Sequence, residues 1–222
     1  MTTAPTGRRT SAVPAPRTAH TAPVTEVVRT EISRLQHGYL NDRSDAIGAL
    51  ARLRRGAGKD AATIPDLWGL LDTGLLYATP GVRHDEAEAA VFTALTLYAL
   101  HQQSRGTAMH HTGGDELGTA VRRLMPPGEF DEPVRKRFVR AGSAPTLPVL
   151  AARLRELVPL LRGQDRSLDY ALLAEQLYIW QRPGGRDEVR RAWGRSFHAY
   201  RPPKSTDDSS RTPAQTDPKD AP

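Results

Sequence analysis

Residues 87–100 read AEAAVFTALTLYAL and are apolar on almost every face of a helix. A helix without a polar face is stable in water only when other elements cover it on all sides. The run is shorter than the roughly 18 apolar residues from which a membrane span is suspected. It therefore predicts a central, buried helix with further helices packed around it.

Helical periodicity continues on the N-terminal side of this run. The apolar positions of a first helix are Val24, Val28, Ile32 and Leu35. Gly38 is expected to end that helix, and Ser44 or Asp45 can cap the next one, which Gly56 closes. The apolar residues that this second helix is expected to turn inward are Ile47, Leu50 and Leu53.

The C-terminal side of the run contains more segments with helical patterns. They lie at roughly 115–125, 131–141, 147–162, 168–181 and 186–200. A short helix anchored by Trp68 is also expected at 65–71. No segment alternates strictly in the manner of a strand, and no Asn-Gly or Asp-Gly hairpin turn occurs. The sequence predicts an all-α fold, a compact bundle of roughly eight helices.

Two terminal segments differ in composition from the body of the chain. Residues 1–22 are rich in Thr, Ala and Pro, and residues 203–222 are polar and contain four prolines. Neither can bury enough apolar surface to become ordered, so we expect two disordered tails around a helical domain at 23–202. The stretch PPGEFDE at 126–132 interrupts the helical pattern. The domain is therefore one unit or two packed lobes, 23–127 and 128–202.

The composition favours a polyanionic partner. Of the 31 basic residues 27 are arginine, and the chain has a net charge of +6. Arginine binds phosphate through two parallel hydrogen bonds, so nucleic acid is the first expectation and an acidic membrane surface the second. The chain has no cysteine, which excludes disulfides and a cysteine nucleophile. Its first residues lack the apolar core of a secretory signal, so we expect a cytoplasmic protein without a membrane association.

The segment PVRKRFVR, residues 133–140, has four positive charges within six residues. On a helix, Lys136, Arg137 and Arg140 fall within about a quarter turn, and Val134 and Phe138 lie toward the opposite side. The apolar side would hold the basic side outward. Such a face either binds an anion or is simply solvated with bulk counterions.

Further arginines lie near helix ends and on helix faces. They are Arg52, Arg54, Arg55, Arg122, Arg123, Arg153, Arg155, Arg182, Arg186, Arg190 and Arg191. Several of these are alternatively partners of helix C-termini or of Glu156 and Glu188 in surface salt bridges. From the residues alone, Arg52 and Arg122 join the candidate nucleic-acid contacts because they extend the basic helix ends.

No catalytic or metal-binding pattern stands out. The sequence GAGK at 56–59 lacks the spacing and the hydroxyl residue of a phosphate loop. Neither His110–His111 with Asp115 nor the stretch 84–86 has the spacing of a three-ligand metal site. We expect a protein that is not an enzyme and needs no cofactor or metal.

Several stretches, taken in order, resemble the CasB family, the small subunit of the type I-E CRISPR Cascade complex. They are ALARLRRGAG, IPDLWGLL, RHDEAEAA, AAVFTALTLYALHQ, GGDELGTAVRRL, RKRFVRAGSAPTLPVLAARLRELVPLLR and ALLAEQLYIWQRPGGRDEVRRAWGRSF. The resemblance covers about seven-tenths of the chain and excludes both tails.

This resemblance implies a non-enzymatic helical subunit that bridges the other Cascade subunits together with a second copy of itself. Its basic surface would contact crRNA, the guide RNA, and the unwound target DNA, including the displaced strand, and so stabilise the R-loop in antiviral defence. Motif positions assign this role to Arg54, Arg55, Arg83 and Arg140. They extend it to Lys136, Arg137, Arg155, Arg182 and Arg186.

Two other classes of function stay open from the residues themselves. A free-standing helical DNA-binding protein or regulator would need a base-reading helix-turn-helix, which we cannot place in the sequence. A small hydrolase that uses the histidines would need the ligand spacing that is missing.

Overall fold

The computed structural model describes residues 17–57, 64–67 and 69–200. In this part of the chain it contains nine α-helices and a 3₁₀ turn, η2. Their bounds are α1 Arg17–Leu40, α2 Ser44–Gly56, η2 Pro65–Leu67, α3 Gly74–Ala78, α4 His84–Gln102, α5 Leu117–Arg122, α6 Glu132–Gly142, α7 Leu147–Gly163, α8 Tyr170–Trp180 and α9 Gly185–Ala199. A single β-bridge, His110 to Leu168, is the only extended pairing among these residues. The all-α prediction is confirmed.

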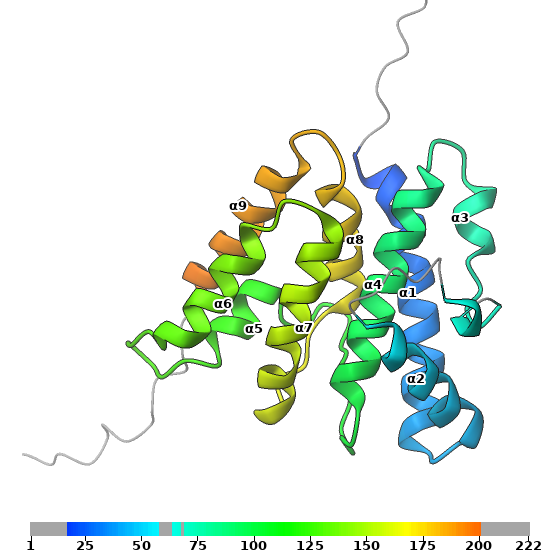
Figure 1. Cartoon of the computed structure of the whole chain (residues 1–222), viewed down its shortest axis with the longest axis horizontal. Coiled ribbons are helices and arrows are strands. Elements are labelled where there is room, and N and C mark those ends of the chain that lie inside the picture. The colour runs from blue at the N-terminus through cyan, green and yellow to red at the C-terminus, as the bar shows by residue number, and fades with distance from the viewer. Residues whose placement is uncertain (1–16, 58–63, 68, 201–222) are drawn as a thin grey trace, which may run out of the picture.

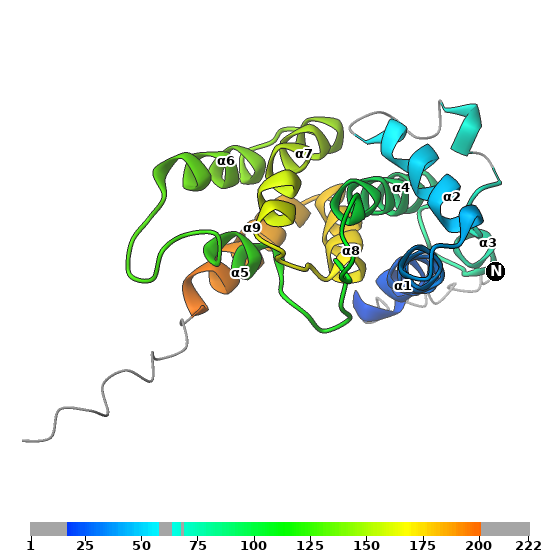
Figure 2. The ribbon, with the colours of Figure 1, turned by 90° about the horizontal axis from the view of Figure 1, so that it is seen from below.

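Helix α4 is the central helix that its composition predicts. It packs against α1, α2, α7 and α8, and Figure 2 shows it between these four helices. Leu95 and Leu97, which lie on nearly opposite faces of α4 because they are two residues apart, are both fully buried. The helix therefore contacts neighbours on most of its circumference, which explains why it needs almost no polar residues.

The N-terminal helix is longer than its sequence pattern suggested. Helix α1 begins at Arg17, whereas the disordered tail was expected to continue to residue 22. Thr21 is buried and donates a hydrogen bond of 2.9 Å from its Oγ1 to Oε1 of Glu175 on α8. Contact with α8 thus orders residues whose own composition does not favour a helix. The rest of the expected tails, 1–16 and 203–222, lies outside the described residues.

Gly38 does not end α1, contrary to the prediction, because α1 continues to Leu40. A Cβ atom at Gly38 would lie 2.6 Å from Cβ of Ala46 on α2. The glycine is therefore required by the close approach of two helices. In sequence, a glycine that permits packing and a glycine that ends a helix look alike.

Helix α2 also differs from its prediction in detail. Its N-cap residue is Arg43, without a side-chain cap, and Asp45 instead pairs with Arg43 at 2.9 Å. Ile47 is 39% exposed, and the residues that α2 buries are Ala46, Ala49, Leu50, Leu53 and Gly56. The helix is rotated from the expected orientation because small alanines allow it to approach α1 and α4 closely.

The C-terminal helices complete the bundle and pack on the N-terminal ones (Figure 1). Helix α6 packs on α7, α5 on α9, and α8 on α1, α4 and α9. The five helix-like segments expected after residue 114 therefore all occur. One continuous cluster of buried apolar residues runs through both halves that the stretch 126–132 suggested. The domain boundaries otherwise stay predictions.

Two expected features fall outside the described residues, namely the Gly58–Lys59 part of the GAGK loop and Trp68. Around Trp68, the short helix expected at 65–71 is represented by the 3₁₀ turn η2. Within the described ranges, no helix combines the length and apolarity needed to cross a bilayer.

Candidate nucleic-acid interface

The turn between the end of α8 and the start of α9 lies against the N-terminal part of α4. Gly184, the N-cap residue of α9, has φ 73°, a left-handed conformation that glycine adopts without strain. A Cβ atom at Gly185 would lie 1.8 Å from the carbonyl oxygen of Ile179, so only glycine fits there. Nε2 of Gln181 donates a 2.8 Å hydrogen bond to the carbonyl oxygen of Glu86 on α4. The turn is thus fixed to the N-terminal part of α4.

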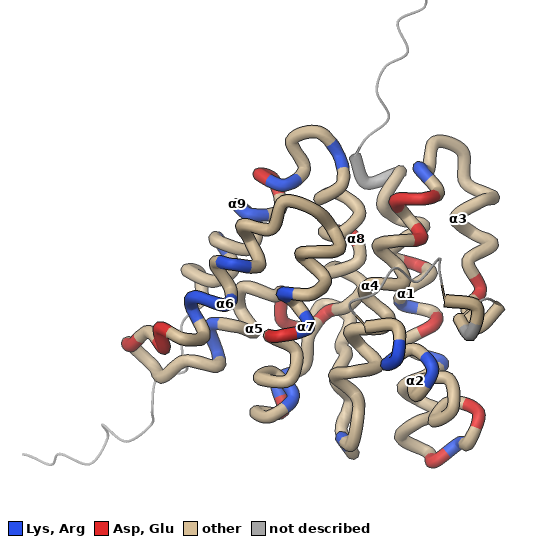
Figure 3. Tube along the Cα trace, viewed as in Figure 1, with Lys and Arg blue, Asp and Glu red and all other residues tan. Residues whose placement is uncertain are grey.

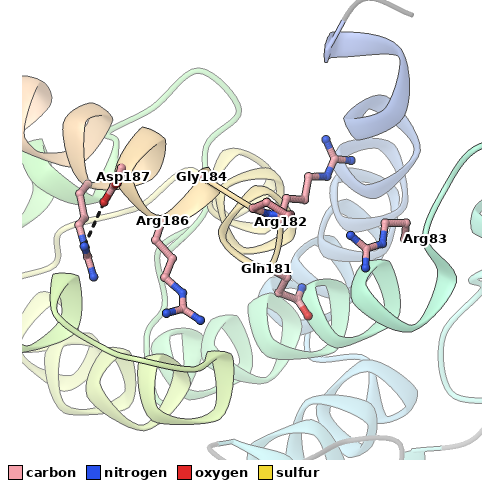
Figure 4. Close-up of a pocket in the computed structure, with 8 residues that line it drawn as sticks. Arg83, Gln181, Arg182, Gly184, Arg186 and Asp187 are labelled. Carbon is pink, nitrogen blue, oxygen red and sulfur yellow. Dashed lines mark hydrogen bonds and ion pairs between the residues drawn. The ribbon is translucent and has the colours of Figure 1, made fainter. Parts of the chain in front are cut away.

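A pocket of about 570 Å³ opens at this turn, and we call it the arginine pocket. Four cationic side chains and one acidic side chain line it. Its lining residues are Arg83, Gln181, Arg182, Pro183, Gly184, Arg186, Asp187 and Arg190. In Figure 4, Arg83 and Arg182 lie on one side of Gln181 and Arg186 lies on the other. Arg83 therefore comes together with Arg182 and Arg186, which lie far from it in sequence, and the family resemblance assigned all three.

The arginines of the pocket are only weakly neutralised by this chain. Arg83 pairs with Glu86 at 2.5 Å, and Arg190 pairs with Asp187 at 3.1 Å. Both arginine side chains are about half exposed, and such surface pairs typically contribute at most about 1 kcal/mol. The Arg182 guanidinium lies 4.2 Å from the centroid of the Tyr178 ring, which orients it without neutralising its charge.

The first turn of α9 adds a further attraction for anions. No side chain caps its N-terminus, because Gly184 has none. The Gly185 N–H donates to the Arg182 carbonyl oxygen, and the helix dipole with the other first-turn N–H groups favours negative charge at this end. Together with Arg186 in the same turn, they give the arginine pocket the chemistry of a phosphate site.

Helix α6 presents its basic residues as predicted. Val134 is buried, and the Phe138 ring packs 5.4 Å from that of Phe197, while Lys136 and Arg140 are exposed. Arg137 is partly exposed and donates to the carbonyl oxygen of Pro133 at 3.3 Å. Phe138 therefore packs toward α9 while α6 as a whole packs on α7, and Lys136 and Arg140 face solvent.

The carboxylates near this face of α6 pair only loosely with its charges, whereas Glu132 pairs closely with Arg135 at 2.7 Å. Glu132 lies 3.9 Å from Lys136 and Glu156 lies 3.8 Å from Arg140. The hydrogen bond from Arg135 lowers the pKa of Glu132. Salt bridges within the chain therefore neutralise only part of the positive charge on this face of α6.

Helix α6 is connected to the arginine pocket through Arg190. Nε of Arg190 donates a 2.6 Å hydrogen bond to the carbonyl oxygen of Gly142, the last residue of α6. Arg190 was not among the nucleic-acid contacts predicted from the sequence. Its spacing of four from Arg186 was visible in the sequence, but its contact with α6 is a tertiary feature.

The other candidate residues lie outside the pocket. Arg52, Arg54 and Arg55 lie near the end of α2, and Arg155 is exposed on α7. Figure 2 shows α6, α7 and α2 along one edge of the molecule, and Figure 3 shows basic residues on all three. These helices share a side, although α2 and α6 lie toward opposite ends of the long axis in both views.

Arg122 is held by contacts within the chain. Its Nη1 donates to the carbonyl oxygen of Pro126 at 3.2 Å, and its guanidinium lies 5.3 Å from the ring centroid of Phe130. Arg123 pairs with Asp115 at 3.2 Å. The structure therefore gives Arg122 a role in fixing the loop before α6 and does not join it to the arginine pocket.

The histidines do not form a metal site in the part of the chain that the structure describes. His110 is buried, and its Nδ1 lies 3.2 Å from the carbonyl oxygen of Leu168 and 3.1 Å from the backbone nitrogen of Tyr170. Burial lowers the pKa of His110, although the nearby Asp169 acts in the opposite direction. The net shift favours a neutral ring. His110 therefore acts as a structural link between two loops.

Comparison with protein-family models matched residues 49–198 to the family of CRISPR-associated protein Cse2. A solved structure of CasB from Thermobifida fusca has 50% sequence identity, with a TM-score of 0.73, and the match covers 79% of this chain and 98% of that chain. A search of the curated proteins found no match.

Two more distant structures share the fold. A CRISPR-associated protein of the Cse2 family from Thermus thermophilus is 21% identical, with a TM-score of 0.57 over 81% of this chain and 98% of that chain. A chain of a CRISPR RNA-guided surveillance complex is 17% identical, with a TM-score of 0.58 over 79% of this chain and 96% of that chain.

Proposed function

Because the chain belongs to the family of CRISPR-associated protein Cse2, we propose that it is a non-catalytic small subunit of a type I-E Cascade surveillance complex in the cytoplasm. Its partners are the other Cascade subunits, a second copy of itself, crRNA and unwound target DNA. Its role is to hold nucleic-acid strands by their phosphates and thereby stabilise the R-loop during antiviral defence. The family match and the similarity to CasB support this proposal.

The arginine pocket is the observation that carries the nucleic-acid role. Arg83, Arg182, Arg186 and Arg190 line one hollow beside an uncapped helix N-terminus. Arginine forks and free N–H groups both recognise phosphate oxygens. The last residue of α6 is hydrogen-bonded to Arg190 of this pocket. From there, the basic side of α6 extends the positive surface through Arg140, Arg137 and Lys136.

These contacts suit a task that does not depend on sequence. A positive surface that follows a sugar-phosphate backbone tolerates any base order, and its affinity falls steeply with salt. Replacing a DNA duplex by an RNA–DNA hybrid is nearly balanced in free energy, so a few backbone contacts can shift the equilibrium. We therefore assign the candidate arginines to phosphate contacts.

The proposal is tested by replacing Arg182 and Arg186 jointly by alanine in the complex assembled with guide RNA. Hydrogen bonds to charged groups are worth roughly 1.5–3 kcal/mol each, so target binding should weaken about tenfold or more. The slope of log affinity against log salt should become shallower by roughly 0.7 for each lost contact to a single strand. Displaced-strand reactivity toward permanganate measures target opening.

The matched control replaces Arg191 and Arg195, two exposed arginines of the same helix that do not line the pocket. It removes the same charge and should leave target opening near the wild-type level. If both variants weaken target opening equally, the effect comes from the net charge of the protein and does not depend on the arginine pocket. Wild-type opening in the folded Arg182/Arg186 variant would disprove the assignment, and failure to co-purify with Cascade subunits would disprove the subunit role.

A further inference from the structure

A second concave surface lies beside the arginine pocket, between α6 and α9. It consists of two adjoining hollows of about 370 and 320 Å³ that share Phe138, Val139 and Gly194. The remaining lining residues are Gly142, Ser143, Arg190 and Trp193 in one hollow and Phe130, Arg135, Phe197 and His198 in the other. We call the two hollows together the α6–α9 groove.

The walls of the groove are aromatic and partly uncovered. The Phe138 ring lies 6.2 Å from that of Trp193, and the Phe130 ring stacks on Phe197 at 6.2 Å with only 9° between their planes. Phe130 is 57% exposed and Val139 is 51% exposed, although most large apolar residues of the described chain are buried. Water therefore contacts an apolar surface that a flat, apolar ligand could cover.

Cationic side chains stand at both ends of this groove. Arg190 lines one hollow as well as the arginine pocket, and Arg135 lines the other hollow. Arg190 also lies 5.6 Å from the ring centroid of Trp180, which stacks on Trp193 at 5.6 Å. The groove and the arginine pocket thus share the Arg190 side chain.

We propose that the α6–α9 groove binds an unpaired nucleobase of the strand whose phosphates lie in the arginine pocket. A nucleotide offers a flat aromatic face next to an anionic phosphate, which matches an aromatic groove that ends at arginines. Each hollow is near the lower limit, about 300 Å³, of pockets that hold small molecules, which suits a single base. The inference rests on the proposed function, because it needs a strand at the arginine pocket.

Gly194 provides a way to fill the groove without disturbing the fold. A Cβ atom at Gly194 would have no other atom within 4 Å, so the space above this residue in α9 is open. A leucine there meets no neighbour at its Cβ, improves the helix propensity of α9 and extends into the space proposed for the base. Gly48 on α2 is equally open and lies outside the groove, so Gly48→Leu is the matched control.

The test compares two labelled 12-nucleotide single strands of equal charge, oligothymidylate and its abasic analogue, by fluorescence anisotropy with the full chain at low salt. One stacked base is worth enough to make oligothymidylate bind about fivefold or more tighter than the abasic strand. Gly194→Leu should abolish this preference and leave abasic-strand binding unchanged, whereas Gly48→Leu should retain it. A 5-iodouracil strand should crosslink to Phe130, Phe138 or Trp193 under ultraviolet light.

The outcomes separate this inference from the proposed function. Wild-type protein that binds both strands equally, or Gly194→Leu protein that retains the preference, overturns the base site and leaves the phosphate contacts intact. Wild-type protein that binds neither strand overturns the proposed function itself. Should Gly194→Leu change only co-purification with other subunits, the groove is a protein-docking surface and the base site is wrong.

Discussion

His101 is a fully buried histidine on the central helix, and its environment keeps it neutral. Its Nδ1 lies 3.0 Å from the hydroxyl of Tyr170, which is also fully buried. Burial, with a smaller contribution from the nearby Arg162 cation, lowers the pKa of His101 from 6.5 to about 4. A proton on this ring in the folded protein would therefore be costly.

This environment makes the stability of the fold depend on pH. The unfolded chain binds the proton near pH 6.5 and the folded chain only near pH 4, so stability is complete above pH 6.5 and falls as the pH decreases. Between pH 6.5 and pH 5 the loss from this residue should be about 2 kcal/mol. His101→Gln should show a correspondingly smaller change, measured by urea unfolding at several pH values.

The exposed His37 on α1 provides the control, because its ring is solvated. His37→Gln leaves the buried His101 ring in place, so the loss of stability assigned to His101 should persist in this variant. If His101→Gln also keeps the wild-type slope, the His101 ring is not held neutral in the folded protein.

Individual residues also show what the sequence could predict. The charge of α6 and the apolar anchors Val134 and Phe138 were readable, because helical periodicity alone separates the two sides. The role of Gly38 was misjudged, because the close approach of Ala46 is a property of another helix. Arg190 was missed for the same reason, since its partner Gly142 is 48 residues away.

Among the structural elements, the turn between α8 and α9 has the strictest requirements. Gly185 admits no side chain, because a Cβ atom would lie 1.8 Å from the Ile179 carbonyl oxygen. Gly184 needs a left-handed backbone, which asparagine can also adopt. The two neighbouring glycines therefore differ in how they should respond to substitution.

Gly185→Ala should separate α9 from α8 and destabilise the protein by about 3 kcal/mol, in the range of overpacked interiors. The same change should weaken strand binding, because Arg182 and Arg186 flank this turn in the arginine pocket. Urea unfolding and oligonucleotide anisotropy measure the two effects.

Gly184→Asn is the matched substitution one residue earlier. It should cost less than about 1 kcal/mol, because asparagine tolerates positive φ and its side chain can cap the N-terminus of α9. If both variants are equally stable, the contact at Gly185 does not constrain the turn.

Element positions were more predictable than element orientations. Helices α4 and α6 to α9 follow from apolar periodicity, because their core positions are large and regularly spaced. The rotation of α2 was not predictable, since alanines rather than Ile47 face the core. The start of α1 was missed because contact with α8 supplies the order that local composition lacks.

At the scale of the whole molecule, the described helices share one core. Helix α8 contacts α1 and α4, and α5 contacts α9, so helices before the stretch 126–132 pack against helices after it. The division into lobes at 127–128 was suggested by prolines and glycine in a loop. Such residues indicate an interruption of a helix, and they contain no information about which helices pack together afterwards.

A shared core predicts cooperative unfolding. The protein should unfold in a single thermal transition, with equal calorimetric and van't Hoff enthalpies, since neither half can lose its neighbours independently. Differential scanning calorimetry measures both enthalpies. Two resolved transitions, or a calorimetric enthalpy well above the van't Hoff value, would instead indicate lobes that unfold separately.

The candidate interface was only partly predictable at this scale. The types of residue and their helices could be read from the sequence, because basic residues cluster in short stretches. Their proximity in space could not be predicted, because Arg83 and Arg182 are brought together only by the packing of α4 against α8.

The face-to-face indoles of Trp180 and Trp193 also have an optical consequence. Two chromophores held this close, with planes 24° apart, couple their electronic transitions. Because Arg190 sits against one indole and the α6–α9 groove reaches the other, we expect an occupant of either site to alter that coupling. The molecule thus contains its own label-free spectroscopic indicator at the surface where strands are proposed to bind.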